Sequence, residues 1–262
     1  MWQYKQQRED LVQGQKIEEE MKAMIFAAGL GTRLQPLTDN KPKAMVPFRG
    51  QPLLFHAISY LKQFGVDTVV VNVHHFAQQV IDYIQVNNGF GIQVLISDES
   101  DELLDTGGGL KNAAGYFKND EDIIVLNTDV LTDLDLNAML DCHRRSGALA
   151  TLAVRKRVSS RYLLVDENAV LCGWRNTKSG EQIIARKSSS LNDRAFSGVH
   201  IIKAELLDKL QPIGKFSIIQ SYLQLATNNV ISSYDHSESY WFDMGKIETF
   251  DEADKIIPEL NN

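Results

Sequence analysis

The sequence contains few cysteines, no long apolar run and no excess of positive charge. Only two of its 262 residues are cysteine, Cys142 and Cys172, and they lie far apart. We therefore expect reduced thiols in a cytoplasmic protein rather than a disulfide or a metal pair. No apolar run approaches the ~20 residues that a membrane span needs, and residues 1–20 lack the apolar segment of a secretory signal. The net charge of −7 argues against a broad nucleic-acid-binding face. Because the sequence has no long apolar run and no excess of positive charge, we expect neither a membrane nor a nucleic acid as a partner.

The first half of the sequence alternates between apolar runs typical of buried strands and segments with helical spacing. Strands are expected over residues 24–28, 68–73, 92–96, 123–126 and 148–154. Helices are expected over residues 51–64, 76–86, 106–116 and 134–144. Such alternation implies parallel strands joined by right-handed crossovers. We therefore predict an α/β protein with three α/β/α layers and a Rossmann-like, mostly parallel mixed sheet.

The second half is less regular, with shorter apolar runs separated by turn residues. Strands are expected over 162–165, 169–174 and 196–202, with a strand pair at 230–234 and 240–244, and helices over 204–210, 216–226 and 247–257. Internal repeats and low-complexity linkers are absent. We expect a flexible or helical extension over 1–20 and a single domain over 21–262. The second half of this domain, 151–262, would cover the carboxyl edge of the sheet formed by 21–150.

The first predicted strand leads into a glycine turn that is followed by two basic residues. Gly29 and Gly31 form the turn, and Arg33 and Lys43 come shortly after it. A buried strand that feeds such a turn commonly presents backbone N–H groups to a phosphate. A Walker A loop would need a lysine directly after its last glycine, and a dinucleotide fingerprint would need a third glycine where Leu34 stands. Neither template fits this loop.

The pattern that does fit is A-A-G-x-G-T-R-L-x-P-L-T followed by P-K. It consists of Ala27, Ala28, Gly29, Gly31, Thr32, Arg33, Leu34, Pro36, Leu37, Thr38, Pro42 and Lys43. This pattern resembles the sugar-1-phosphate nucleotidyltransferases. The resemblance runs from residue 21 to about residue 257, with later motifs in the family's order at Gly107–Gly109, Asn127–Asp129, Phe196–Gly198 and Trp241–Gly245. The compact length and the T-G-G-G motif resemble N-acetylmuramate-1-phosphate uridylyltransferases and related bacterial hexose- or heptose-1-phosphate enzymes.

The resemblance implies the nucleotide-diphospho-sugar transferase fold and a Mg²⁺-dependent reaction. A nucleotidyl group would pass from a nucleoside triphosphate to a sugar 1-phosphate, with release of pyrophosphate. Repulsion between the two polyanions is worth roughly 1–4 kcal/mol for each pair of unit charges, so cations and N–H dipoles must offset it. By resemblance, Arg33 would bind the β- and γ-phosphates, and Lys43 would bridge the α-phosphate and the sugar phosphate. Asp129 and Asp243, each following an apolar run, would hold the Mg²⁺ ion.

The resemblance also divides the domain into a nucleotide-binding half, 21–150, and a sugar-binding half, 151–262. The implied nucleotide-binding residues are Ala27, Ala28, Gly29, Gly31, Thr32, Thr106, Gly107 and Gly108. The implied sugar-binding residues are Asn127, Ser197, Gly198 and Trp241. On the residues alone, Gly107 and Gly108 could equally be a glycine-rich helix N-terminus, and Trp241 could be a core side chain. We expect a monomer or a small homo-oligomer.

Two departures from the family pattern bear on specificity. Ala44 replaces a proline that many relatives carry after the signature lysine. The glutamate-lysine-proline element that grips the sugar in hexose-type relatives is missing, and Gly173–Asn176 stands in about its place, so the sugar stays open. One alternative function is a cytidylyltransferase acting on a phosphorylated alcohol such as phosphocholine. Another is a catalytically silent sugar-nucleotide sensor, although such proteins usually lose a metal aspartate or the basic pair, all of which this sequence retains.

Overall fold

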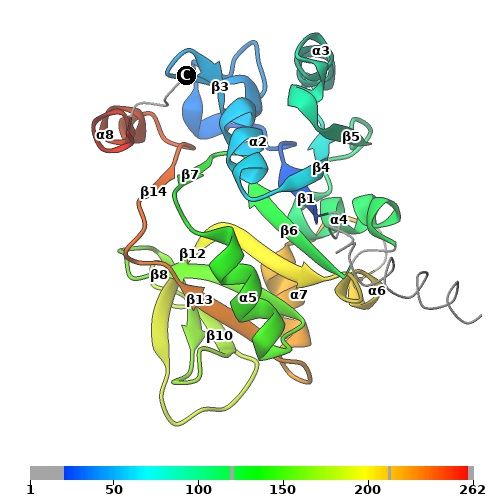
Figure 1. Cartoon of the computed structure of the whole chain (residues 1–262). Coiled ribbons are helices and arrows are strands. Elements are labelled where there is room, and N and C mark those ends of the chain that lie inside the picture. The colour runs from blue at the N-terminus through cyan, green and yellow to red at the C-terminus, as the bar shows by residue number, and fades with distance from the viewer. Residues whose placement is uncertain (1–20, 119–120, 212–213, 259–262) are drawn as a thin grey trace, which may run out of the picture.

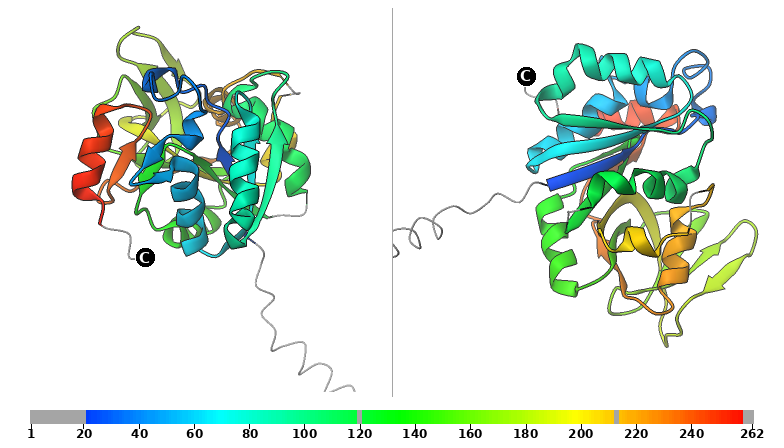
Figure 2. Two further views of the ribbon diagram at one scale, coloured as in Figure 1. Left: turned by 90° about the horizontal axis from the view of Figure 1, so that it is seen from above. Right: turned by 90° about the vertical axis from the view of Figure 1, so that its right-hand side faces the viewer.

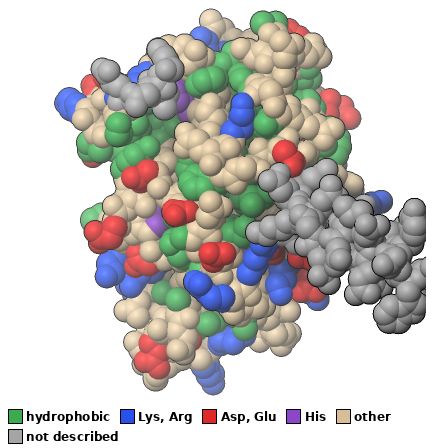
Figure 3. All heavy atoms as spheres, viewed as in Figure 1, with side chains coloured by type: hydrophobic (Ala, Val, Ile, Leu, Met, Phe, Trp, Pro, Cys, Tyr) green, Lys and Arg blue, Asp and Glu red, His purple; other side chains and the backbone are tan. Residues whose placement is uncertain are grey.

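The computed structural model describes residues 21–118, 121–211 and 214–258. The predicted extension over 1–20 lies outside the described residues. Within these residues no helix combines the length and the apolar character needed to cross a membrane. Cys142 and Cys172 are both free thiols. On the face drawn in Figure 3, Lys and Arg side chains are interspersed with Asp and Glu.

Four parallel strands form the centre of the first half. They are β1 (Met21–Phe26), β4 (Val66–Val73), β5 (Gln93–Asp98) and β6 (Asp122–Asn127), in the order β5-β4-β1-β6. The helices between them are α2 (Leu53–Gln63), α3 (Ala77–Val86) and α4 (Asp105–Asn112). Met24 lies between Val70 of β4 and Val125 of β6. The central strands are buried on both faces, which explains their continuous apolar runs.

Two cores, one on each face of the sheet, produce the three layers. Successive side chains on a strand point to opposite faces, so Ala23 and Ile25 enter one core while Met24 enters the other. The first core packs against α2, α3 and α5 (Leu136–Ser146). The second core packs against α4, α6 (Leu206–Lys209) and α7 (Ile218–Leu225). Figure 2 shows helices above and below the parallel strands.

The second half extends the same sheet with antiparallel strands. β12 (Asn192–Lys203) lies antiparallel beside β6, followed by β9 (Arg161–Val165), β10 (Leu171–Asn176) and β11 (Gln182–Ile184). β8 (Ala150–Arg155) pairs with β12 on one side and with β13 (Ile231–Asp235) on the other. The predicted α/β fold with a mixed sheet is confirmed, and parallel pairing is concentrated in the first half. The second half thus continues the sheet as well as covering its edge.

Strands form near both predicted ranges, 230–234 and 240–244, but the prediction that they pair with each other is wrong. β13 lies parallel to β8, whereas β14 (Trp241–Asp243) pairs with β7 (Val130–Thr132), a short strand that the sequence pattern did not reveal. Burial explains the difference, because the first three residues of β13 are buried beside β8 and the chain then crosses to β7. The crossing brings β14 against the residues that directly follow β6.

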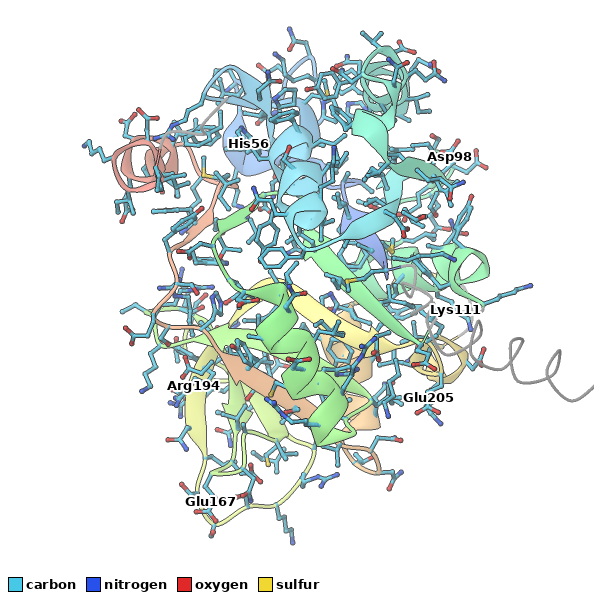
Figure 4. All side chains as sticks on the ribbon, viewed as in Figure 1. His56, Asp98, Lys111, Glu167, Arg194 and Glu205 are labelled. Atoms are coloured by element: carbon cyan, nitrogen blue, oxygen red, sulfur yellow. The ribbon has the colours of Figure 1, made fainter. Side chains whose placement is uncertain are left out.

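The remaining elements are short or lie at the rim. They are β2 (Pro47–Phe48), β3 (Gln51–Pro52), α8 (Glu248–Ile256) and 3-10 turns over Thr32–Leu34, Lys43–Met45, Asn88–Gly91 and Ala113–Phe117. The helix predicted over 106–116 thus ends as an α-helix at Asn112. Lys111 of α4, labelled in Figure 4, donates to the Leu207 carbonyl at 2.8 Å and ties α4 to α6.

Candidate active site

The loop after β1 presents unpaired backbone N–H groups. Among the described residues, none accepts a hydrogen bond from the N–H of Gly29, Leu30 or Gly31. Gly31 adopts φ +65°, and a Cβ atom there would lie 2.9 Å from Thr38 Cγ2 and 3.0 Å from Lys43 Cβ. Only glycine meets both constraints without strain. The loop is therefore shaped to receive hydrogen-bond acceptors such as phosphate oxygens.

Two of the predicted nucleotide-binding N–H groups are already engaged. Asn72 Oδ1 accepts hydrogen bonds from Ala27 N–H at 2.7 Å and from Ala28 N–H at 3.3 Å. Asn72 Nδ2 in turn donates to Glu99 Oε1 at 2.7 Å, and both of these side chains are buried. Ala27 and Ala28 hence anchor the loop to β4 through Asn72. The sequence analysis missed Asn72, whose signal is a single amide inside the apolar run of β4.

The two predicted metal aspartates lie side by side. Asp129 follows β6 directly, and Asp243 ends β14 opposite Val130 of β7. The Met244 N–H donates to the Asp129 carbonyl at 2.8 Å, which fixes the two strands at this point. The 113 residues between the aspartates span most of the second half, and the β7–β14 pairing brings the two aspartates together.

The two predicted basic residues reach the same aspartates. Lys43 Nζ donates to Asp129 Oδ2, and Arg33 Nη1 lies 3.8 Å from Asp243 Oδ2. A Cβ atom on Gly245 would lie 2.8 Å from Arg33 Nη2 and 3.0 Å from Asp129 Oδ2, so glycine is what leaves room for this cluster. The structure thus brings all four predicted residues to one point at the carboxyl edge of the parallel strands.

Burial and charge shift the pKa values of the two carboxyl groups in opposite directions. Burial raises the pKa of Asp129, the negative charge of Asp243 adds to that shift, and the charge of Lys43 opposes it. Burial alone would also raise the pKa of Asp243. Hydrogen bonds from Asp129 and the Gly245 N–H, with the charges of Lys43 and Arg33, outweigh burial and lower it. Of the two carboxyl groups, Asp129 is thus the one whose pKa is raised and Asp243 the one whose pKa is lowered.

The two carboxyl groups suit a divalent cation with a preference for oxygen. A cation between them would favour the ionised form of both groups. The described part of the chain contains no cluster of three or more His, Cys, Asp and Glu side chains that could hold a metal ion. Asp129 and Asp243 would therefore supply two ligands, and phosphate oxygens and water the others, as is usual for Mg²⁺.

A cleft of about 830 Å³ opens beside this cluster. Arg33 of the first half lines it together with residues of the second half, among them Asp243, Lys246 and residues of β9, β10 and β12. This volume falls in the ordinary range for small-molecule sites, roughly 300–1,000 Å³. The cleft therefore joins the aspartate pair to the second half of the domain.

The second glycine cluster is packed against another part of the chain. The N–H groups of Gly107 and Gly108 both donate to the Phe216 carbonyl, at 2.9 Å and 3.2 Å. A Cβ atom on Gly107 would overlap the Phe216 side chain, and one on Gly108 would overlap the Gly214 carbonyl. Thr106 Oγ1 accepts from the Ile218 N–H at 3.1 Å at the start of α7. Packing thus explains these residues, and their contact with a nucleotide stays a prediction.

The predicted sugar-binding residues are largely buried. The Ser197 side chain is 1% exposed and hydrogen-bonds to His236 Nε2 at 2.7 Å, so it does not line the cleft as expected; its neighbour Phe196 does. The reason is that neighbouring side chains of a strand point to opposite faces, so Ser197 and Phe196 of β12 point in opposite directions. Gly198 adopts φ +76° against Asn127, where a Cβ atom would lie 2.6 Å from Asn127 Nδ2.

Trp241 is held in place from two sides. Its Nε1–H donates to the Ser197 carbonyl at 2.8 Å, and the Arg157 guanidinium lies 4.4 Å from a ring centroid. The predicted contact of Trp241 with the sugar would have to use the part of its ring that the Arg157 guanidinium does not cover. Arg157 itself lines the cleft, and no motif in the sequence pointed to it.

Comparisons with known proteins agree with the resemblance. A chain from Caulobacter vibrioides named N-acetylmuramate alpha-1-phosphate uridylyltransferase is 31% identical over 230 residues, 85% of this chain and 91% of the relative. UTP–glucose-1-phosphate uridylyltransferase of Synechocystis is 29% identical over 89% of this chain and 62% of the relative. The chain spans about six tenths of the length of this and several other relatives, which include mannose-1-phosphate guanyltransferases.

Solved structures and a family profile complete the comparison. HddC of Yersinia pseudotuberculosis, crystallised with GMP-PN, superposes with a TM-score of 0.71 at 24% identity, covering 90% of this chain and 98% of the other. A glucose-1-phosphate thymidylyltransferase from Bacillus anthracis, described as putative, gives a TM-score of 0.75 at 17% identity over 92% and 97% of the two chains. These likenesses show the nucleotide-diphospho-sugar transferase fold. The family profile described as nucleotidyl transferase matches residues 22–259, and the chain therefore belongs to the nucleotidyl transferase family.

Proposed function

We propose that the protein transfers a nucleotidyl group from a nucleoside triphosphate to a sugar 1-phosphate, giving a nucleoside-diphosphate sugar and pyrophosphate. The observation that carries this proposal is the meeting of Arg33, Lys43, Asp129 and Asp243 at the mouth of the 830 Å³ cleft. Relatives of the chain are named uridylyl- and guanylyltransferases of sugar 1-phosphates, which supports the same reaction class.

The charges at the mouth of the cleft suit the triphosphate. The open N–H groups of Gly29, Leu30 and Gly31 would donate to phosphate oxygens, and Arg33, with an exposed side chain, would bind the departing pyrophosphate. The planar guanidinium matches paired phosphate oxygens, so it gains strength as charge builds on the leaving group.

Lys43 would stabilise the attacking phosphate. Its amine, now on Asp129, lies beside the loop and can bridge the α-phosphate and the oxygen of the sugar phosphate. The attacking group is already an anion at neutral pH, so no general base is required. The contribution of this chain is then to align two polyanions and to reduce their repulsion.

Asp129 and Asp243 would hold Mg²⁺ through their carboxylate oxygens. When bound, the ion supplies positive charge between the α-phosphate and its leaving group. We assign residues 21–150 to the nucleotide and 151–262 to the sugar, since the cleft is lined by both. The free thiols Cys142 and Cys172 favour a reducing compartment such as the cytoplasm.

A turnover matrix tests the proposal. Purified protein is assayed for pyrophosphate release with each of the common nucleoside triphosphates against a panel of sugar 1-phosphates and phosphocholine, with Mg²⁺ and with excess EDTA. We expect release with some sugar 1-phosphate, abolished by EDTA. A silent matrix would contradict the enzymatic function, and release with phosphocholine alone would redirect it to a phosphorylated alcohol.

A further inference from the structure

Arg157 is an arginine of the cleft that forms no ion pair with a carboxylate of the described residues, although the charge of Asp243 acts on it. It follows β8, is half-buried and lines the cleft. Its guanidinium is stacked on Trp241, whose own position is fixed by the hydrogen bond to the Ser197 carbonyl. Trp241 and Asp243 are two positions apart on β14, so their side chains share one face of the strand. Arg157 is therefore held beside the strand that carries a metal aspartate.

The hydrogen-bonding capacity of Arg157 is largely unused. Its Nε is buried without a partner, Nη2 donates to the Phe196 carbonyl at 3.1 Å, and Nη1 reaches the Val158 carbonyl only at 3.4 Å. No carboxylate among the described residues forms an ion pair with it. Five other arginines do pair with aspartate, namely Arg33, Arg49, Arg144, Arg175 and Arg194. A partly buried guanidinium left in this state favours an incoming anion.

The neighbouring Arg155 is a second arginine close to Trp241 and serves as a comparison for Arg157. Because the residue type is the same, any difference between the two comes from their positions. Its guanidinium lies 5.9 Å from a Trp241 ring centroid, but its two Nη atoms donate to the Ser239 carbonyl at 3.2 Å and the Ser237 carbonyl at 3.4 Å. Arg155 thus stabilises the turn between β13 and β14 through these hydrogen bonds. Arg157 makes similar contacts to carbonyl groups, but it differs from Arg155 in having a buried Nε without a partner and in lining the cleft.

The wall around Arg157 is also positively charged. Arg161 and Lys178 line the same cleft, and Asp243, whose charge acts on Arg157, is the one acidic residue among the described lining residues. A neutral sugar would be recognised by groups that both donate and accept hydrogen bonds, such as Asn176 and Ser160. Together, Arg157, Arg161 and Lys178 carry more positive charge than the recognition of sugar hydroxyl groups requires.

We propose that Arg157 binds an acidic group of the acceptor sugar, so that the acceptor is a sugar 1-phosphate carrying a second anionic group. This inference rests on the proposed function, in which Lys43 and the aspartate-bound cation already serve the 1-phosphate. The second group is a carboxylate or a second phosphate, since the guanidinium fork matches the paired oxygens of both.

Matched acceptors test the inference. Glucuronate 1-phosphate differs from glucose 1-phosphate by its carboxylate, and N-acetylmuramate 1-phosphate differs from N-acetylglucosamine 1-phosphate by its lactyl acid. Glucose 1,6-bisphosphate supplies the arm with a second phosphate. We expect kcat/KM for the acidic acceptor of at least one set to exceed that of its neutral counterpart by about tenfold or more. Preference for the neutral member in every set would overturn the inference and leave nucleotidyl transfer standing.

Variants then assign the effect to Arg157. In Arg157→Gln the ratio of acidic to neutral kcat/KM should fall by about 10- to 100-fold, and Arg157→Lys should restore part of it. The control is Arg194→Gln, an arginine of β12 paired with Asp235 and labelled in Figure 4, which should leave the ratio unchanged. The ratio is measured within one preparation, so partial unfolding cancels. Equal loss with both acceptors would place Arg157 on the 1-phosphate and overturn the inference. No turnover with any acceptor would contradict the proposed function itself.

Discussion

The two glycine clusters of this protein look alike in the sequence but do different work in the structure. Gly29 and Gly31 lie in an open loop whose N–H groups have no partner among the described residues, beside Lys43 and Arg33. Gly107 and Gly108 are buried and donate their N–H groups to the Phe216 carbonyl. The first cluster offers backbone donors to a ligand, whereas the second lets one chain segment approach another.

The comparison shows that a glycine-rich stretch after a strand does not by itself form a phosphate-binding site. The N–H groups of the stretch must also remain unpaired, and this depends on segments remote in sequence. Here the segment from Gly214 to Ile218 occupies the second cluster through two N–H groups and Thr106 Oγ1. Changes near the open loop should therefore affect catalysis, and changes in the buried cluster should affect stability.

The largest effect is expected at the aspartate beside the open loop. Asp129→Asn should reduce turnover by at least about 1,000-fold, because a developing charge loses its cation, while the melting temperature shifts by less than about 4 °C. The matched control is Asp122→Asn, at the other end of β6, where Asp122 pairs with Arg144. That control should lower stability and retain kcat. Retained turnover in Asp129→Asn would remove this residue from the site.

A comparable change in the buried cluster should act on stability instead. In Gly108→Ala the new methyl group would overlap the Gly214 carbonyl, so we expect a loss of about 3 kcal/mol in the free energy of unfolding, measured with urea. Gly115→Ala is the control, because nothing lies within 4 Å of a Cβ atom there. An unchanged stability with a raised KM for the triphosphate would instead support the predicted nucleotide contact of Gly108.

A buried histidine of the second half gives a pH-dependent test of packing. Burial lowers the pKa of His236 to about 4, with the charge of Arg155 adding to the shift. The unfolded chain, with an ordinary pKa near 6.5, therefore binds more protons between these values, and stability is lost as pH falls through this window. From about pH 7 to about pH 5 the loss due to His236 should approach about 2 kcal/mol.

The variant His236→Gln isolates that contribution. Glutamine can keep the hydrogen bond to Ser197 Oγ but does not titrate, so urea unfolding should show a shallower fall in stability with acid than in the parent protein. His200, with a pKa lowered by burial to about 3, continues to contribute in both proteins. Identical pH slopes would show that His236 is accessible to protons in the folded state.

The smallest effect is expected at the tip of the open loop. A Cβ atom on Gly29 would meet nothing within 4 Å, so Gly29→Ala should leave the free energy of unfolding within about 0.5 kcal/mol of the parent value. The methyl group would occupy space that we assign to the nucleotide. The KM for the triphosphate should rise roughly fivefold, equivalent to about 1 kcal/mol. A loss of stability with an unchanged KM would mean that this loop, too, is a packing element.

The sequence by itself determined the parallel strands of the first half and indicated the residues of the candidate site. Apolar runs long enough to be buried on both faces indicated β1, β4 and β6, and the spacing from Ala27 to Lys43 indicated the nucleotidyltransferase loop. Local patterns suffice for these features because burial and turn geometry act on neighbouring residues. Asp129 was also found in this way, since it directly follows a buried strand.

Only the tertiary structure decided which residues share the cleft. The pairing of β7 with β14 places Asp243 beside Asp129, and the place of β12 in the sheet buries Ser197 while its neighbour Phe196 lines the cleft. Arg157 is distinguished by a buried Nε without a partner in the wall of the cleft, which no local pattern encodes. Strand pairings between distant segments are set by the fit of the whole core. A single-residue shift reverses the direction of every side chain on a strand.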